Sequence, residues 1–294
     1  MKNEEKSVTD IAPSAGQLNI VFSVAACLIG DTNMHTIFEF GSRYGEDTVE
    51  FAKKYPAATV YSFECNPKSV ALLKQKILSY PNIVFNEYAV SDSSETIKFY
   101  QIDENKTKTT WIDGNQGASS IFPSSGKYPV EEYFQNDIEV NAITLDWFLQ
   151  TYTIAEIDIL WMDIQGAELK ALQGLKEKIK AVKIIHLEAE FIEIYKTQPL
   201  FKTIDKFLKS QHFYLLGYSS KTHYSADVIY VNKAYFANEM LVKAAAMIPV
   251  QTKNAQYYLS GIAFSIKYFG FRTIKLLKHF YDLLLNKPDS HARL

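Results

Sequence analysis

This 294-residue sequence has few cysteines and a small net charge. Its two cysteines, Cys27 and Cys65, are too few for a disulfide framework, and no metal-ligand spacing connects them. We therefore expect a reduced, cytoplasmic protein. The net charge of −2 leaves no basic excess of the kind that nucleic-acid binding uses, so the sequence predicts no nucleic-acid partner.

A long uninterrupted apolar run is also missing from the first thirty residues. Residues 11–30 carry no charge, but Pro13, Ser14 and Gly16 interrupt them, and the first ten residues hold three acids against two lysines. A secretory signal has a positively charged start, and a spanning segment is longer and more apolar. We interpret residues 15–29 as a buried helix that covers one edge of a sheet, with a secretory or spanning segment as the alternative.

Short apolar runs alternate with helical patterns through most of the chain. This alternation predicts an α/β fold with a doubly wound, mostly parallel sheet, and the short link between the last two strands makes one of them antiparallel. The expected strands are residues 36–40, 59–64, 83–90, 96–102, 137–143, 157–163, 183–189, 213–219 and 226–232. The expected helices lie around residues 48–55, 67–77, 145–149, 167–180 and 200–208.

The chain divides by composition into an N-terminal segment and helix (1–33), a sheet domain (34–234) and a helical extension (235–294). Residues 251–294 hold seven Lys or Arg and two acids, so the extension either packs on the domain or a partner subunit, or contacts a membrane surface. The oligomeric state is not indicated. Residues 103–127 form a long polar loop, and its Gly117–Ser120 stretch is either a lid over a ligand or a plain solvent loop.

The first candidate site is the turn after the first strand, "FEFGSRYGEDT", with the spacing E-x-G-x-x-x-G at Glu39, Gly41 and Gly45. Ligands of open α/β sheets bind at the carboxyl ends of strands. The pattern lacks the three glycines of the dinucleotide fingerprint, and its carboxylate would repel a phosphate. It suits a cationic ligand with an amino group and a sulfonium, which indicates S-adenosylmethionine. A tight turn with a capping acid is the alternative.

Two later strand ends strengthen this interpretation. Glu64 follows Gly41 by 23 residues, close to the separation at which an acid accepts hydrogen bonds from ribose hydroxyls. At the end of the third strand, "EYAVSD", the adenine rim would be formed by Ala89, Val90 and Ser91, with Asp92 or Glu87 receiving the adenine amino group. A plain strand end is the alternative there.

The stretch "LWMDIQGAEL" ends a continuous apolar strand on Asp163. Asp163, His186, Glu188 and Glu190 are candidate bases, and Glu188 is preferred over His186, which we interpret as a core histidine. Asp163 and Glu188 together could also hold a divalent cation. Glu168 falls in the first turn of the next helix, where a carboxylate is favourable to the helix dipole.

The motifs "FEFGSRYGEDT", "VYSFECNP", "EYAVSD", "ITLDWFL", "LWMDIQGAELKALQG" and "HLEAEF" resemble, in order and spacing, the FkbM-type S-adenosylmethionine-dependent methyltransferases over about residues 34–232. The resemblance implies the class I methyltransferase sheet of seven strands with an antiparallel last strand. It implies that Asp163 lies beside the transferred methyl group. Gln165 stands where the common pattern has Glu, so no role of an acid carries over to that position.

On this basis the predicted function is O-methylation of a hydroxyl on a sugar, a glycan or another natural product, with a small-molecule or glycan acceptor. A non-catalytic cofactor-binding or scaffold protein and a nicotinamide-dependent oxidoreductase are the alternatives. The predicted catalytic residues are Asp163 and Glu188. The predicted cofactor contacts are Glu39, Gly41, Ser42, Arg43, Gly45, Thr48, Glu64, Cys65, Asn66, Ala89, Val90, Ser91 and Asp163.

Overall fold

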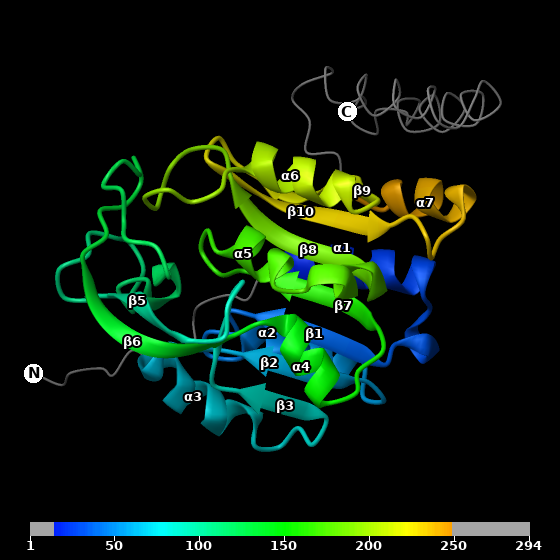
Figure 1. Cartoon of the computed structure of the whole chain (residues 1–294), viewed down its shortest axis with the longest axis horizontal. Coiled ribbons are helices and arrows are strands. Elements are labelled where there is room, and N and C mark those ends of the chain that lie inside the picture. The colour runs from blue at the N-terminus through cyan, green and yellow to red at the C-terminus, as the bar shows by residue number, and fades with distance from the viewer. Residues whose placement is uncertain (1–14, 249–294) are drawn as a thin grey trace, which may run out of the picture. The chain divides into compact units, whose positions relative to one another are not determined.

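The computed structural model describes residues 15–248 and contains a seven-stranded sheet in the order β3-β2-β1-β7-β8-β10-β9 (Figure 1). The strands of this sheet are β1 (Thr36–Phe40), β2 (Thr59–Phe63), β3 (Ile83–Asn86), β7 (Ile157–Met162), β8 (Val182–Glu190), β9 (Phe213–Lys221) and β10 (Ser225–Asn232). The pairs from β3 to β8 are parallel, and β10 is antiparallel to both of its neighbours. The expected doubly wound sheet is confirmed, and the last strand in the sequence is the antiparallel one.

Helices cover both faces of the sheet. They are α1 (Ala15–Leu28), α2 (Glu46–Lys54), α3 (Pro67–Ile77), α4 (Leu145–Thr151), α5 (Glu168–Gln173), α6 (Phe201–Ser210) and α7 (Asn238–Ala245). Alternation along β1 sends Phe38 into one apolar core with residues of α4, α5 and α6, and Ile37 into a second core with residues of α1, α2 and α7. All six residues of β7 are buried, as a central strand between two helical layers requires.

Helix α1 covers a face of the sheet, where an edge was predicted. Its buried residues Leu18 and Val21 pack in the same core as Ile159 of β7 and Ile184 of β8, and the helix also contacts the edge strand β9 (Figure 1). Helix α7, which the sequence placed in the C-terminal extension, packs against α1. The remainder of the extension, with its suggested membrane-surface contact, lies outside the described residues.

Two predicted elements are each split in two. The strand expected over 83–90 becomes β3 and a separate short strand, β4 (Ala89–Val90), in a second sheet of order β4-β6-β5 with β5 (Thr96–Ile102) and β6 (Gln135–Ile143). The helix expected over 167–180 ends at Gln173, Gly174 caps it and packs on the carbonyl of Ser91, and a 3-10 helix follows at Lys176–Ala181.

The second sheet lies beside the carboxyl ends of the parallel strands (Figure 1). The chain from β5 to β6 includes a short 3-10 helix, Gln116–Ala118. We call residues 103–134 the covering segment. Topology therefore brings this segment, which is far from β1 and β2 in sequence, over the edge of the sheet at which ligands of such folds bind.

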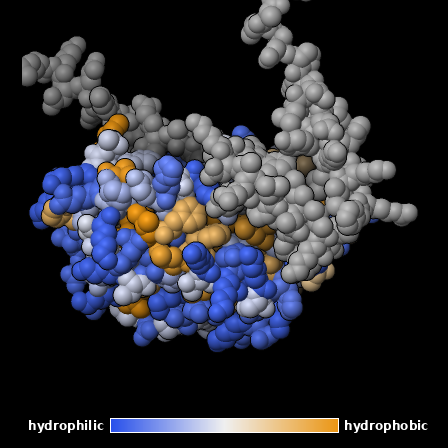
Figure 2. Space-filling view, turned by 90° about the horizontal axis from the view of Figure 1, so that it is seen from above, coloured by the Kyte–Doolittle hydropathy of each residue, from blue (hydrophilic) through white to orange (hydrophobic). Residues whose placement is uncertain are grey.

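The surface of the described residues is mostly hydrophilic on the face seen from above, with an apolar band across its middle (Figure 2). Within residues 15–248, no helix is both long enough and apolar enough to cross a membrane.

The turn after β1 depends on Gly41. Its φ is +81°, and a Cβ at this position would lie 1.9 Å from the carbonyl oxygen of Asp163. The Asp163 N–H in turn donates to the Phe40 carbonyl at 3.0 Å. Gly41 therefore packs on the main chain at the end of β7.

Gly41→Ala is expected to lower the free energy of unfolding by at least about 1–3 kcal/mol, since the positive φ alone costs that much and the clash adds to it. Gly16→Ala is the matched control: Gly16 is exposed in α1, and a Cβ added there would meet no atom within 4 Å, so it should gain about 0.5–1 kcal/mol. Urea denaturation of both variants measures the difference. Equal stabilities would contradict the packing of Gly41 on Asp163.

Candidate active site

A cavity of about 320 Å³ opens at the carboxyl ends of the central strands. Its walls come from the ends of β1, β2, β7 and β8, from β4, and from the covering segment. Nine of the predicted site residues line it: Gly41, Arg43, Glu64, Cys65, Asn66, Ala89, Val90, Asp163 and Glu188. The volume falls in the range of small-molecule sites, and the cavity joins residues that lie more than a hundred positions apart in sequence.

Glu39 does not line this cavity. Its side chain is buried beneath α2, where the Thr48 hydroxyl donates to Oε2 at 2.5 Å. Burial raises the pKa of Glu39 from 4.5 to about 8. In the described protein Glu39 therefore contacts the sheet and α2, and its predicted contact with the cofactor stays a prediction.

Ser42, Gly45, Thr48 and Ser91 likewise lie behind the cavity wall. The Ser62 hydroxyl donates to Ser42 Oγ at 2.8 Å, and Gly45 is the left-handed residue that precedes α2. The Ser91 N–H donates to the Ile143 carbonyl at 2.9 Å. These residues hold the loops in shape, and their predicted contacts with a cofactor stay predictions.

Glu64 stands at the cavity wall at the end of β2. Its Oε2 accepts from the Arg43 N–H at 2.8 Å and its Oε1 from the Asn66 N–H at 2.7 Å. These bonds fix the carboxylate in one orientation, while burial raises the pKa of Glu64 to about 7. Asn66 continues the arrangement by accepting from Gln101 Nε2 at 2.6 Å, which ties the loop to β5.

An apolar slot lies next to Glu64. It is lined by Phe63, Tyr88, Ala89, Val90 and Phe99, a surface against which a flat aromatic base can pack. Neither acid that the sequence suggested for an adenine amino group lines it. Asp92 pairs with Lys170 at 2.9 Å, and Glu87 pairs with Lys74 at 2.6 Å, both on the outside of the cavity.

Gln165 joins the two predicted catalytic acids. Its Nε2 donates to Asp163 Oδ1 at 2.6 Å and to Glu188 Oε2 at 3.0 Å, and its Oε1 accepts from the Tyr195 hydroxyl at 2.7 Å. The backbone of Gln165 has a φ of 53°, which aims the side chain across the strand ends. The position where the family resemblance fails is thus the residue that organises the acid pair.

The acids at this end of the cavity have raised pKa values. Asp163 is open to the cavity, yet protein encloses it on its other sides, and this burial raises its pKa. Burial also raises the pKa of Glu188 well above its usual range, and the neighbouring Asp163 adds to the effect. Carboxyls tuned in this direction are suited to proton transfer near neutral pH.

His186 is a core residue, as the sequence interpretation expected. Its ring stacks on Trp161 at 3.8 Å between centroids, and Nε2 lies 2.8 Å from the Ser219 hydroxyl. Burial lowers the pKa of His186 to about 3. Glu168 is fully buried rather than facing solvent, and its Oε1 accepts from the Ile164 N–H at 3.0 Å, so it stabilises the turn after β7.

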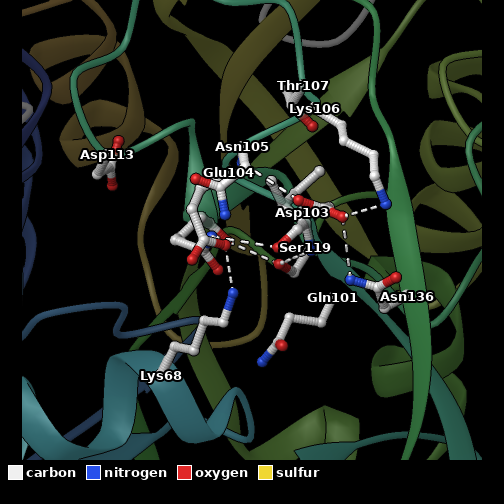
Figure 3. A network of polar contacts seen from close by, with 12 residues as sticks. Lys68, Gln101, Asp103, Glu104, Asn105, Lys106, Thr107, Asp113, Ser119 and Asn136 are labelled. Carbon is white, nitrogen blue, oxygen red and sulfur yellow. Dashed lines mark hydrogen bonds and ion pairs between the residues drawn. The ribbon is translucent and has the colours of Figure 1, made fainter.

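The covering segment is fastened to the sheet domain at several points. Asp113 pairs with Arg43 at 2.5 Å, and Trp111 packs on the Arg43 guanidinium at 5.0 Å. Glu104 pairs with Lys68 of α3, and Asp103 lies between Lys106 and Asn136 (Figure 3).

The predicted Gly117–Ser120 stretch lines the cavity in part, and the Ser120 hydroxyl donates to the Gln165 carbonyl at 2.7 Å. The sequence did not identify the other lining residues of this segment: Trp111, Asn115, Gln116, Ile121, Tyr128, Glu131 and Tyr133. Aromatic residues in an otherwise polar loop were the available signal.

The suggested divalent cation finds no support in the described residues. Within 15–248 no three His, Cys, Asp or Glu side chains are grouped so that they could hold a metal ion. The Gln165 amide occupies the position between Asp163 and Glu188, and its two N–H groups use the carboxylate oxygens that a cation would need.

Comparison with known proteins gives matches in sequence and in structure. A family model described as the methyltransferase FkbM domain matches residues 39–215. The 2-O-methyltransferase NoeI of Sinorhizobium fredii (strain NBRC 101917 / NGR234) is 28% identical over 174 residues, which are 58% of this chain and 69% of NoeI.

Two solved structures illustrate the similarity in chain path. Magnesium protoporphyrin IX methyltransferase from Synechocystis PCC 6803 with bound SAM is 16% identical, with 74% of this chain and 81% of that chain covered and a TM-score of 0.39. An rRNA methylase from Streptococcus thermophilus is 12% identical, with 72% and 92% covered and a TM-score of 0.38.

Glu39→Gln is expected to flatten the dependence of stability on pH. A folded-state pKa of about 8 against 4.5 means that the folded protein keeps a proton that the unfolded chain releases. The resulting decrease in the free energy of unfolding is absent below about pH 4.5 and grows as the pH rises toward 8, by up to about 1.4 kcal/mol per pH unit. Guanidinium denaturation at several pH values should show that the free energy of unfolding of the variant increases relative to that of the wild type as the pH rises. A constant difference between the two proteins, or the same increase for the exposed Glu87→Gln, would contradict this account.

Gln165→Glu is expected to destabilise the protein by about 1–3 kcal/mol at pH 8, because it removes two donors and places a third carboxylate between two others. The loss should be smaller at pH 5, because the raised pKa values of Asp163 and Glu188 favour their protonated forms as the pH falls. Gln150→Glu is the matched control, since the exposed Gln150 also donates to a carboxylate, that of Asp146, at 2.8 Å. Thermal unfolding at both pH values compares the variants, and equal losses would contradict the bridging role.

Proposed function

The chain belongs to the FkbM methyltransferase family and is an S-adenosylmethionine-dependent methyltransferase, and from this premise we propose that it methylates a hydroxyl oxygen of a sugar, a glycan or another natural product. The observation that carries the proposal is the bridged acid pair Asp163–Gln165–Glu188, which lies in the same cavity as Glu64. The name of the relative NoeI, a 2-O-methyltransferase, supports transfer to oxygen.

The residues at one end of the cavity fit the cofactor. Glu64 would accept hydrogen bonds from the ribose hydroxyls, and the apolar slot beside Val90 and Phe99 would hold the adenine ring. The carboxyl of Asp163 would face the positively charged part of the cofactor. S-adenosylmethionine supplies an activated methyl group when it is bound, so the protein needs to orient the acceptor and take up one proton.

Orientation is the larger contribution of the protein. Holding an acceptor oxygen in line with the methyl carbon and the sulfur can be worth on the order of 7–11 kcal/mol. As the new O–CH₃ bond forms, the S–CH₃ bond breaks and its electron pair stays on sulfur. The hydroxyl proton passes to a carboxylate, for which we propose Glu188. The raised pKa of Glu188 suits this carboxylate to take up a proton near neutral pH.

The alternatives from the sequence are less consistent with this site. A nicotinamide-dependent oxidoreductase lacks support from the family membership and from the turn after β1, which has no G-x-G-x-x-G pattern. A non-catalytic binding protein would have no use for a bridged pair of acids with raised pKa values at the open end of the cavity.

Calorimetric titration with S-adenosylhomocysteine tests the cofactor half. Glu64→Ala should weaken binding at least about tenfold, because it removes the acceptor of the ribose hydroxyls. Glu87→Ala is the control and should leave the affinity unchanged, since Glu87 pairs with Lys74 outside the cavity. Absence of binding to the wild-type protein would overturn the proposal.

Mass spectrometry tests the transfer itself, through a product heavier by one methylene group after incubation with S-adenosylmethionine and a panel of glycosides and cell extracts. Glu188→Gln should lower kcat by about 10²–10⁴-fold while cofactor affinity stays the same. Full activity of this variant would remove Glu188 from the mechanism.

A further inference from the structure

The end of the cavity away from Glu64 has a distinct composition. The sheet order places β8 and β10 on the far side of β7 from β1 and β2, so the Glu188 strand lies three strands from the Glu64 strand, roughly 14 Å at normal strand spacing. Glu188, Glu190 and Ser225 line the cavity there, opposite Tyr128 and Tyr133 of the covering segment. An acceptor must occupy this end if the cofactor lies against Glu64.

The tyrosines form a firm aromatic wall. Tyr133 stacks on the buried Tyr195 at 6.1 Å between ring centroids with an interplanar angle of 16°, and Tyr128 packs against Tyr133 at 5.8 Å. The Tyr133 hydroxyl donates to Glu131 Oε2 at 2.6 Å. Rings fixed in this way give a flat apolar surface at low entropic cost, with polar groups at its rim.

Glu190 offers an unused acceptor beside this wall. Its side chain is 1% exposed, and its Oε2 has no hydrogen-bond partner among the described residues. The Gln198 side chain lies close enough to lower the pKa of Glu190, but its Nε2 makes no hydrogen bond to this oxygen within the described residues. A buried acceptor without a donor is unfavourable, and a hydroxyl from a bound molecule would supply the donor.

The charge of the lining is strongly one-sided. Among the described residues the cavity is lined by the acids Glu64, Glu131, Asp163, Glu188 and Glu190 and by a single cation, Arg43. Arg43 is already paired with Asp113 and lies on the loop after β1. At the end lined by Glu188 and Glu190, an anionic acceptor would therefore meet carboxylates with no cationic side chain beside them, and a like charge at such a distance is costly.

We infer that the space between Tyr128, Tyr133, Glu188 and Glu190 is an acceptor subsite for an uncharged carbohydrate ring, and that it discriminates against uronates and sugar phosphates. One ring face packs on the tyrosines, while ring hydroxyls donate to Glu188 and Glu190. This inference rests on the proposed function, which it narrows from any hydroxyl compound to neutral sugars.

Binding measured without turnover tests the inference separately from the proposed function. Saturation-transfer NMR on the full chain, with and without S-adenosylhomocysteine, would use methyl glycosides of glucose, galactose, mannose and fucose at millimolar concentration. The matched anionic probes are the methyl glycosides of glucuronic and galacturonic acid. We expect at least one neutral glycoside to bind. The uronate counterpart of that glycoside, or the uronates as a group, should bind at least about tenfold more weakly.

Tyr133→Ala and Glu190→Ala should each weaken binding of the neutral glycoside at least about tenfold, with circular dichroism and affinity for S-adenosylhomocysteine unchanged. Tyr152→Ala is the matched control, because Tyr152 lies exposed directly after α4 and outside the cavity. The inference is overturned if no neutral glycoside binds, if uronates bind as tightly, or if both site variants bind like the wild type. Sugar binding without methyl transfer would instead count against the proposed function.

Discussion

The contact between the main chains of Gly41 and Asp163 is the constraint on which the site depends. It brings the ends of β1 and β7 together so closely that no side chain fits between them. With these two strands fixed, the loop that holds Glu64 through the Arg43 N–H lies on one side, and the Gln165 bridge to Glu188 lies on the other. Both groups line the same cavity, on either side of this contact.

The sheet could be predicted from the sequence because its strands are continuous apolar runs between amphipathic helices, a pattern that few other folds produce. Glu64 could be placed because its distance from Gly41 follows from one helix and one strand. The break of the strand expected at 83–90 could not, since no glycine or proline marks it and the pairing of Ala89 with Ala142 decides it. The packing of Gly174 could not be predicted either, because the residue that it contacts, Ser91, is distant in sequence.

The candidate site was harder to predict than the fold. A strand buried on both faces gives no sign of which face an acid will occupy, so the contact of Glu39 with Thr48 could not be predicted from the sequence. Tyr128 and Tyr133 reach the cavity through contacts with Tyr195 and Glu131, which no periodicity encodes. At Gln165 the departure from the family pattern indicated only that no acid role carries over, and its bridge between Asp163 and Glu188 became visible in the structure.

The acids that surround the cavity have a thermodynamic consequence for ligand capture. Glu64 has a pKa of about 7, and burial raises the pKa of Asp163 as well. A cationic molecule beside such groups favours their ionised forms, so its arrival expels protons into the solvent. The protein then holds a positively charged ligand more firmly in alkaline than in acidic solution, and the heat of association varies with the ionisation enthalpy of the buffer.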